Sequence, residues 1–373
     1  MKKNIVLIFF SLSFALLLVY SLVFIWVSVF QKYKDDNIFT EVEKLNFHKE
    51  YSNKIHHLRG NNWPRHKKDF FLKKEDYLFT VFSEFKNEKK NFLIQGDSWA
   101  EYMVFKDSIN ETLQKIANKY RIGLINSGIS SFSPSPMKIQ FKILEEEYSI
   151  KPDYLISIID QTDIGDELCR YRHNIAENRD GTVNYIKREI NTGAVMDASK
   201  YYSFSRIILE KKRFTNFHLT NYYFFKTFHE LKTKLNYINK LGMKESNNYK
   251  CKFQQIQRYL LDLKNEDKYY FMKRTQEYFD FLNSKEYLKK VYIVTFPHAN
   301  HLKKNYKVNV SEIINELNLN PKIVHVDFND IIKNKQFKTN NIYEPNDPAS
   351  HLNEETHKLY IKKIFEIIDL RNL

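Results

Sequence analysis

Short apolar runs alternate with helical patterns from residue 91 to the end of the chain. Each run is rich in β-branched or aromatic residues and is followed by a turn or a polar stretch, which is typical of strands buried in a parallel sheet. The runs cover residues 91–95, 121–126, 153–160, 290–296 and 322–328, and the helical patterns include 99–120, 136–148 and 353–370. The alternation predicts an α/β fold: a three-layer α/β/α sandwich around a five-stranded parallel sheet, with right-handed crossovers.

The third and fourth apolar runs are separated by a long stretch of chain. Its segments 203–213, 219–240 and 252–286 have mostly helical patterns. We therefore interpret residues from about 166 to 286 as a helical insertion, which could form a lid or a wall of a substrate site.

The N-terminal stretch, residues 4–30, contains no charged side chain. As a helix, its 27 residues would extend about 40 Å, enough to cross a bilayer with some tilt. A secretory signal would have a shorter apolar region and a small-residue cleavage site, which this stretch lacks. We predict a single-pass transmembrane signal anchor in the cell inner (plasma) membrane, and a buried core helix is the alternative.

The lysines before this stretch set the expected orientation. Lys2 and Lys3 precede it, whereas Asp35 and Asp36 offset the two lysines that follow it. By the positive-inside rule, residues 1–3 would be cytoplasmic, and the rest of the chain would lie on the periplasmic or extracellular side.

The composition excludes several classes of protein. Only 16 of the 373 residues are Gly or Pro and only two are Cys, which excludes collagen-like, low-complexity and Cys-rich zinc or disulfide scaffolds. One bridge between Cys169 and Cys251 is allowed. The net charge of +14 is scattered along the chain without a nucleic-acid-binding motif, so no nucleic-acid partner is expected.

Residues 31–90 are polar, basic and aromatic, and they include the cluster KIHHLRGNNWPRHKK at 54–68. One interpretation is a juxtamembrane basic patch that contacts anionic headgroups or an acidic polymer. The other interpretation is a solvated linker. In both cases, the globular domain would begin at residue 91 and extend to residue 373.

Polar or small residues follow the predicted strands, where ligands bind in open parallel sheets. These residues are Gly96-Asp97-Ser98, Asn126-Ser127-Gly128, Asp160-Gln161-Thr162-Asp163 and, before the last helix, Asp347-Pro348-Ala349-Ser350-His351.

These residue types fit acyl-transfer chemistry. A nucleophilic serine needs a base, the base needs an orienting carboxylate, and the developing oxyanion needs preorganised donors. We predict Ser98 as the nucleophile, His351 as the base and Asp347 as the orienting carboxylate. The expected oxyanion donors are the N–H groups of Ser98 and Gly128 and the hydroxyl of Thr162.

The same blocks, in the same order, resemble those of the SGNH (GDSL) hydrolase superfamily, whose fold is a flavodoxin-like sandwich. The resemblance covers about residues 91–370 without the insertion, and it implies the same roles for Ser98, Gly128, Asp347 and His351. Two positions depart from the family pattern. Thr162 stands where the family usually has an oxyanion asparagine, and the last block has three residues between Asp347 and His351 instead of two.

Five residues in the regions that follow the strands are candidate substrate contacts. They are Asp97, Asp163, His298, His301 and Arg170. For four of them there is a simpler interpretation: the two histidines as ordinary loop residues, Arg170 as part of a solvated face, and Asp163 as a brace of its own loop.

The sequence thus predicts a membrane-anchored serine esterase that removes O-acyl groups from a cell-envelope polysaccharide or peptidoglycan, with acetyl as the expected acyl group. Neither a metal nor an organic cofactor is expected. Three alternatives stay open. The first is an O-acyltransferase that uses the same acyl-enzyme with a multispanning acyl-transfer partner. The second is a catalytically inactive binding or assembly subunit. The third is a phosphatase or lipid-modifying enzyme, since the net charge also suits anionic lipid.

Overall fold

In the computed structural model, the described part of the chain falls into two units. The structure describes residues 2–30, 47, 50–51, 53–59, 74–87, 90–187, 224, 253–299, 307–333, 341–345, 347 and 350–370. The first unit comprises Met1–Glu50 and Ile190–Tyr249, and the second comprises Tyr51–Glu189 and Lys250–Leu373. The sheet and every candidate site residue that is described belong to the second unit.

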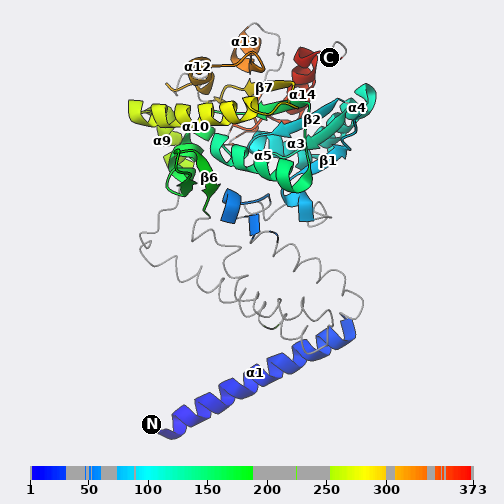
Figure 1. Ribbon diagram of the computed structural model, residues 1–373. Helices are drawn as coiled ribbons and strands as arrows, with labels where there is room; N and C mark the ends of the chain where they lie inside the picture. Colours follow the sequence, from blue (N-terminus) through cyan, green and yellow to red (C-terminus); the bar gives the residue numbers. More distant parts are fainter. Residues whose placement is uncertain are drawn as a thin grey trace. The chain divides into compact units, whose positions relative to one another are not determined.

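A mainly parallel six-stranded sheet forms the centre of the second unit (Figure 1). Its strand order is β1-β3-β2-β4-β7-β8, and all neighbours are parallel except β1 and β3. The strands are β1 (Thr80–Ser83), β2 (Asn91–Gln95), β3 (Gly123–Asn126), β4 (Tyr154–Ile158), β7 (Lys290–Thr295) and β8 (Ile323–Asp327). The prediction of five strands is therefore wrong in number, because β1 adds an antiparallel edge.

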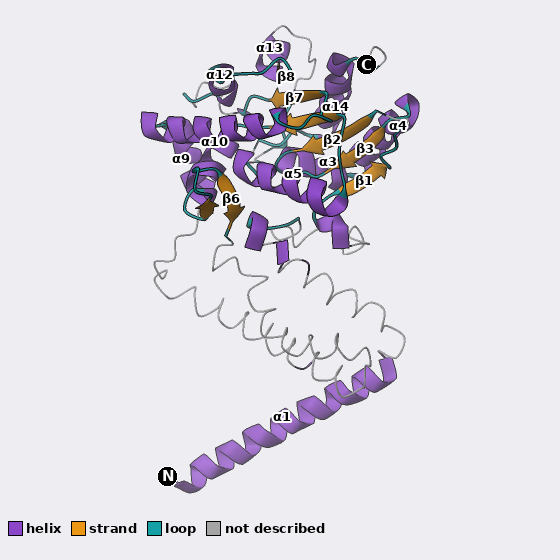
Figure 2. Cartoon of the chain, in the orientation of Figure 1, coloured by secondary structure: helices purple, strands orange, loops and turns teal. Residues whose placement is uncertain are grey.

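Helices cover both faces of this sheet (Figure 2). The helical elements of the described residues are α1 (Lys2–Phe30), η1 (Lys74–Tyr77), α3 (Ser98–Phe105), α4 (Asp107–Tyr120), α5 (Pro134–Tyr148), α6 (Asp163–Gly165), η2 (Asp166–Tyr171), α9 (Phe253–Leu261), α10 (Asn265–Asn283), α12 (Val310–Asn315), α13 (Phe328–Lys333) and α14 (Glu354–Ile368). The helix predicted over 99–120 is two helices, because Lys106 adopts an extended conformation between them.

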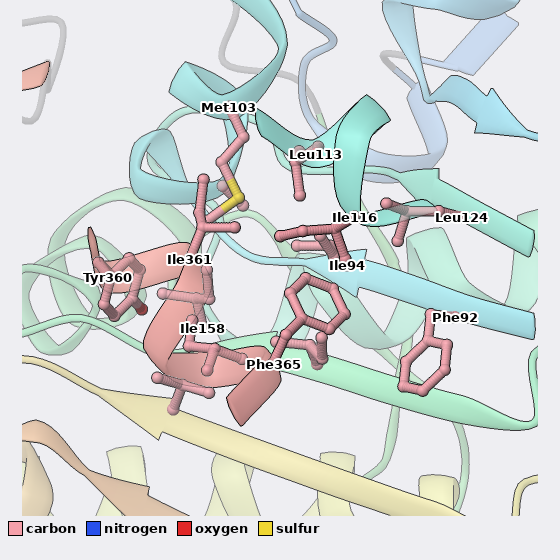
Figure 3. Packing of buried hydrophobic residues seen from close by; sticks show 14 of the residues in the cluster. Phe92, Ile94, Met103, Leu113, Ile116, Leu124, Ile158, Tyr360, Ile361 and Phe365 are labelled. Atoms are coloured by element: carbon pink, nitrogen blue, oxygen red, sulfur yellow. The ribbon is translucent and has the colours of Figure 1, made fainter. Parts of the chain in front are cut away.

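Alternation along β2 directs side chains into two different layers. Phe92 and Ile94 belong to a hydrophobic cluster with residues of α3, α4 and α14 (Figure 3). On the opposite face, the Gln95 side chain donates to the Met137 carbonyl of α5 and accepts from the Tyr278 hydroxyl of α10. The buried layers on both faces fix β2, and with it the start of α3.

The region predicted as a helical insertion is only partly helical. After the π-helical turn η2 it forms an antiparallel hairpin of β5 (Ile175–Glu177) and β6 (Val183–Ile186), which the helical patterns did not predict. Helices α9 and α10 follow within the predicted segment 252–286. The predicted helices at 203–213 and 219–240 lie outside the described residues, except for the single residue 224.

The segment before the sheet differs from its prediction as a linker. Residues 55–59 of the basic cluster are all buried, and Ile55 bridges to Ile186 of β6. Neither a solvated face nor a headgroup-binding patch therefore describes these five residues. They are instead part of the packed second unit.

Helix α1 covers the stretch for which a membrane anchor is predicted. Among the residues that the structure describes, no helix combines the length and the apolar character that crossing a membrane requires.

Candidate active site

Ser98 is the first residue of α3, directly beyond the end of β2. Asp97 caps the helix, because its Oδ1 accepts a hydrogen bond from the Trp99 N–H at 2.9 Å. Gly96 makes the turn from strand to helix against Ile158 of the neighbouring strand, where a Cβ atom would collide. The Ser98 hydroxyl is thus presented at the carboxyl edge of the sheet.

Ser98, His351 and Asp347 form a continuous hydrogen-bonded chain. The Ser98 Oγ lies 2.7 Å from His351 Nε2, and His351 Nδ1 lies 2.5 Å from Asp347 Oδ2. Ser98 and His351 are 253 residues apart in the sequence. The arrangement has the connectivity required of a nucleophile, a general base and a carboxylate that orients the base.

The loop before α14 lets Asp347 reach His351 across three intervening residues. Ser350 has a positive φ of 57°, a conformation that turns the chain sharply before His351. The His351 main-chain N–H also donates to Asp347 Oδ2, at 2.9 Å. The same carboxylate oxygen therefore accepts hydrogen bonds from both the main chain and the ring of His351. Three intervening residues, where the family pattern has two, thus still leave Asp347 within reach of His351.

His298 supports this loop from the end of β7. It is 1% exposed, and its Nε2 lies 2.9 Å from the Ser350 hydroxyl. Its prediction as a substrate contact is therefore not supported, since the ring is buried against the residue before His351. It is better described as a positioning residue.

Tyr102 is a neighbour of the base that the sequence reasoning missed. Its ring packs edge-on against His351, with centroids 4.4 Å apart. Tyr102 lies four residues after Ser98 on the same helix, so helical spacing alone places both on one face. That spacing was the available signal.

The predicted oxyanion donors are less well prepared than the base. The Gly128 N–H donates to the Asn126 side chain at 2.9 Å, and the Thr162 hydroxyl donates to Asp160 Oδ1 at 2.7 Å. Both donors are thus engaged with neighbouring side chains. To stabilise an oxyanion, each would have to share or exchange its partner.

Gly128 nevertheless lies in close contact with the nucleophile helix. A Cβ atom at this position would overlap Ala100 of α3. Glycine is therefore required for this approach of the β3–α5 loop to the helix that carries Ser98.

Arg59 fixes the loop that carries Gly128, and the sequence gave no indication of this role. It is fully buried. Its Nε donates to the Gly128 carbonyl at 2.7 Å, and its Nη2 donates to the main-chain and side-chain oxygens of Asn126 at 2.8 and 2.9 Å. Its Nη1 donates to Thr80 Oγ1 and to the Asp76 carbonyl. Because Arg59 precedes β2 by more than 30 residues, no local motif connects it to the site.

A second set of buried groups, from α3 and from the segment before the sheet, holds the same loop. Glu101 accepts from the main-chain N–H of Ser130 at 3.0 Å and from its hydroxyl. His57 Nε2 lies 2.8 Å from the Ser130 carbonyl. Burial raises the pKa of Glu101 and lowers that of His57 to about 3, so His57 is neutral at pH 7.

Three buried carboxyl groups lie beside the nucleophile. Oxygens of Asp97, Asp160 and Asp163 are within 4.8 Å of one another, so these residues could hold a metal ion. Burial, followed by repulsion from Asp160, raises the pKa of both Asp97 and Asp163 well above the usual range, and burial also raises the pKa of Asp160. The three carboxyl groups are therefore more stable when protons are bound to them than when all three carry a negative charge.

The remaining candidate substrate contacts have structural roles or lie outside the described residues. Arg170 donates through Nε to Asp166 at 2.8 Å, so it is engaged in an ion pair instead of forming part of a solvated face. Asp163 is buried and accepts from the Asp160 N–H, which fits the interpretation as a brace of its loop. His301 lies outside the described residues.

Comparison with protein-family models and with curated proteins identifies no relative. No family model matches the chain, and no curated protein is similar to it. Functional inference therefore depends on the site itself.

Proposed function

We propose that this protein is a serine esterase that cleaves O-acyl groups through an acyl-enzyme on Ser98. The observation that carries the proposal is the hydrogen-bonded chain from Ser98 through His351 to Asp347. Each link has a distance suited to proton transfer or to orientation of the base.

The proposed reaction has two halves. Ser98 Oγ attacks the ester carbonyl while its proton passes to His351 Nε2, and the C–O bond to the alcohol breaks as His351 returns that proton to the leaving oxygen. Water then attacks the acyl-enzyme, with His351 first accepting and then returning a proton to Ser98. Throughout, Asp347 keeps the Nδ1 proton in place and stabilises the positive imidazolium.

The oxyanion would be held next to the start of α3. The Ser98 N–H lies at the helix N-terminus, where the helix dipole favours negative charge. The Gly128 N–H and the Thr162 hydroxyl would join it after releasing their present acceptors. This requirement predicts a slower enzyme than one whose donors already point into the site.

The order of these residues along an α/β fold supports an SGNH-type hydrolase acting outside the cytoplasm. Cys169 is disulfide-bonded, and the chain's other cysteine, Cys251, lies outside the described residues. Disulfides persist mainly in oxidising compartments. Together with the predicted N-terminal anchor, this favours acyl esters of a cell-envelope glycan as substrates.

The hydrogen bond between Ser98 and His351 also argues against an inactive binding subunit. A protein that had lost catalysis would have no reason to keep both partners of the serine–histidine pair at 2.7 Å. An acyltransferase would use the same acyl-enzyme, with a sugar hydroxyl replacing water in the second half of the reaction.

The proposal is tested with the full-length chain and p-nitrophenyl acetate. We expect p-nitrophenol release and an acid-trapped acetyl group on Ser98, both lost in Ser98→Ala. We also expect at least a 10⁴-fold loss of rate in His351→Ala. Ser284→Ala, at the end of α10, serves as a matched control that keeps the parent rate. Release that persists in Ser98→Ala would contradict the proposal, and acetyl transfer to an added sugar in preference to water would identify the acyltransferase.

A further inference from the structure

A small polar pocket adjoins the catalytic base on the side of α3 and α14. Its volume is about 220 Å³. The residues that line it are Tyr102, Lys106, Ile109, Glu344, Asp347, Leu352, Glu354 and His357. Neither the sequence motifs nor the proposed chemistry of Ser98 accounts for this pocket.

Two of the lining residues connect the pocket directly to the base. The Tyr102 ring contacts the His351 ring, and the Asp347 carboxylate bonds to His351 Nδ1. A molecule in the pocket would therefore lie one side chain away from the imidazole that handles the leaving alcohol. That is where the non-reacting part of an ester substrate would be held.

His357 supplies a buried acceptor in the wall of this pocket. It is 2% exposed, and its ring donates to the main-chain carbonyl of Trp99, whereas its Nε2 has no hydrogen-bond partner among the described residues. The donating nitrogen is therefore Nδ1, and Nε2 carries the lone pair. Burial lowers the pKa of His357 to about 3, so the ring stays neutral. A buried acceptor without a donor is costly, and a ligand that supplies an O–H or N–H would remove this cost.

The other polar groups of the wall are mostly acceptors. Glu344, Asp347 and Glu354 contribute three carboxyl groups, against the ammonium group of Lys106. The Asp347 carboxylate also holds His351, and Glu354 also pairs with Lys358 at 3.1 Å, so Glu344 is the lining carboxylate least engaged within the described part of the chain. Carboxylates accept hydrogen bonds and repel anions. We propose that this pocket binds a sugar ring that is rich in hydroxyl groups and carries no acidic group, with His357 Nε2 accepting from one of its hydroxyls. The inference rests on the proposed function, and it assigns the substrate to neutral or amino-bearing glycans and not to uronate polymers.

Binding to a variant that cannot turn over substrate tests this assignment separately from catalysis. The full-length chain carrying Ser98→Ala would be titrated by calorimetry with chitotriose, a neutral N-acetylated trisaccharide, and with trigalacturonate, an acidic one. We expect chitotriose to bind at least tenfold more tightly. His357→Phe in the same background should weaken chitotriose binding at least tenfold, and His357→Gln should recover part of the affinity because its amide oxygen accepts hydrogen bonds.

A surface substitution and a charge reversal complete the test. Lys115→Met, on the exposed side of α4, should bind both sugars as the parent does. Glu354→Lys, at the mouth of the pocket, should shift the preference towards trigalacturonate, and it covers the case in which His357→Phe fails to fold. Equal or tighter binding of trigalacturonate by the parent, unchanged chitotriose affinity in a folded His357→Phe, or no chitotriose binding would each overturn the inference. Loss of ester turnover with intact sugar binding would contradict only the proposed function.

Discussion

The two halves of the candidate site differ in how completely they are assembled. On the side of the base, Asp347, His351 and Ser98 already have the partners that proton transfer requires. On the side of the oxyanion, Gly128 and Thr162 donate to Asn126 and Asp160 instead of into the site. The base half comes from the loop before α14 and from the first residue of α3, and the oxyanion half comes from loops after β3 and β4.

This difference indicates which step limits the proposed enzyme. A prepared base makes Ser98 nucleophilic before substrate arrives, whereas donors that must first leave their acceptors stabilise the tetrahedral intermediate less. The activation free energy of acyl transfer should therefore depend more on changes in the loops after β3 and β4 than on changes that make His351 a stronger base. The predictions below test this contrast.

Asp347→Asn should have the largest effect among the variants that test the contrast. An amide at this position cannot hold the Nδ1 proton as a carboxylate does, so His351 would favour the tautomer with its proton on Nε2. We expect kcat for p-nitrophenyl acetate to fall about 10³- to 10⁴-fold. A fall of less than about tenfold would indicate that Asp347 only shapes the turn.

Arg59→Met should impair the oxyanion half from a distance. It leaves the Gly128 and Asn126 carbonyls and the nearby Glu101 without their buried cation. We expect the free energy of unfolding to drop by about 3–5 kcal/mol. In the protein that remains folded, the factor by which kcat falls should be about ten times the factor by which KM rises. Urea denaturation and steady-state kinetics measure these changes, with Arg258→Met on the exposed side of α9 as the control. An unchanged kcat in folded Arg59→Met would show that Arg59 has no role beyond stability.

Thr162→Asn should increase activity. The longer amide can donate into the site, which the Thr162 hydroxyl does not do while it bonds to Asp160. We expect kcat to rise by up to about tenfold with little change in KM. A decrease would mean that the Thr162–Asp160 bond is itself required for the site.

Asp97→Asn should have the smallest effect at neutral pH and a clear effect on the pH profile. Ser98 Oγ also donates to Asp97 Oδ2 at 3.1 Å, so an ionised Asp97 competes with His351 for the same hydrogen. Burial raises the pKa of Asp97, and Asp160 raises it further. The protonated carboxyl group therefore does not compete at low pH.

The sign of the expected pH effect follows from this raised pKa. As pH rises through the pKa of Asp97, this group ionises and the rate of ester cleavage falls. The contribution of the protonated group to the free energy of unfolding is lost over the same pH range. Asp97→Asn mimics the protonated group, so it should keep kcat within about threefold at neutral pH and remove the decline at higher pH. A decline that persists in the variant would exclude Asp97 as its cause.

The sequence predicted the positions of the site better than its surroundings. Buried parallel strands have continuous apolar runs, and their carboxyl ends mark where polar residues meet, so Ser98 and Gly128 were predicted from the strand ends. His351 was predicted from the block before the last helix, and the structure brings it within 2.7 Å of Ser98. The edge strand β1 was missed because only one of its four residues is buried. The hairpin of β5 and β6 was missed because its short strands have no continuous apolar run.

The supporting residues could not be predicted because their roles depend on tertiary contacts. Arg59 and His57 stand in a basic cluster that resembles a solvated linker, and only the packing against the β3–α5 loop buries them. His298 and Arg170 follow strands as substrate contacts would, yet the structure pairs them with Ser350 and Asp166. Residue type and strand order do not specify such pairings.

Labelling with a fluorophosphonate tests the central claim most directly, because the probe reacts only with an activated serine. The full-length protein would be incubated with the probe, and the modified peptide would be identified by mass spectrometry. The account predicts a single phosphonylated residue, Ser98, with labelling abolished in Ser98→Ala and slowed at least 100-fold in His351→Ala. An unlabelled wild-type protein, or a label on another serine that survives Ser98→Ala, would contradict it.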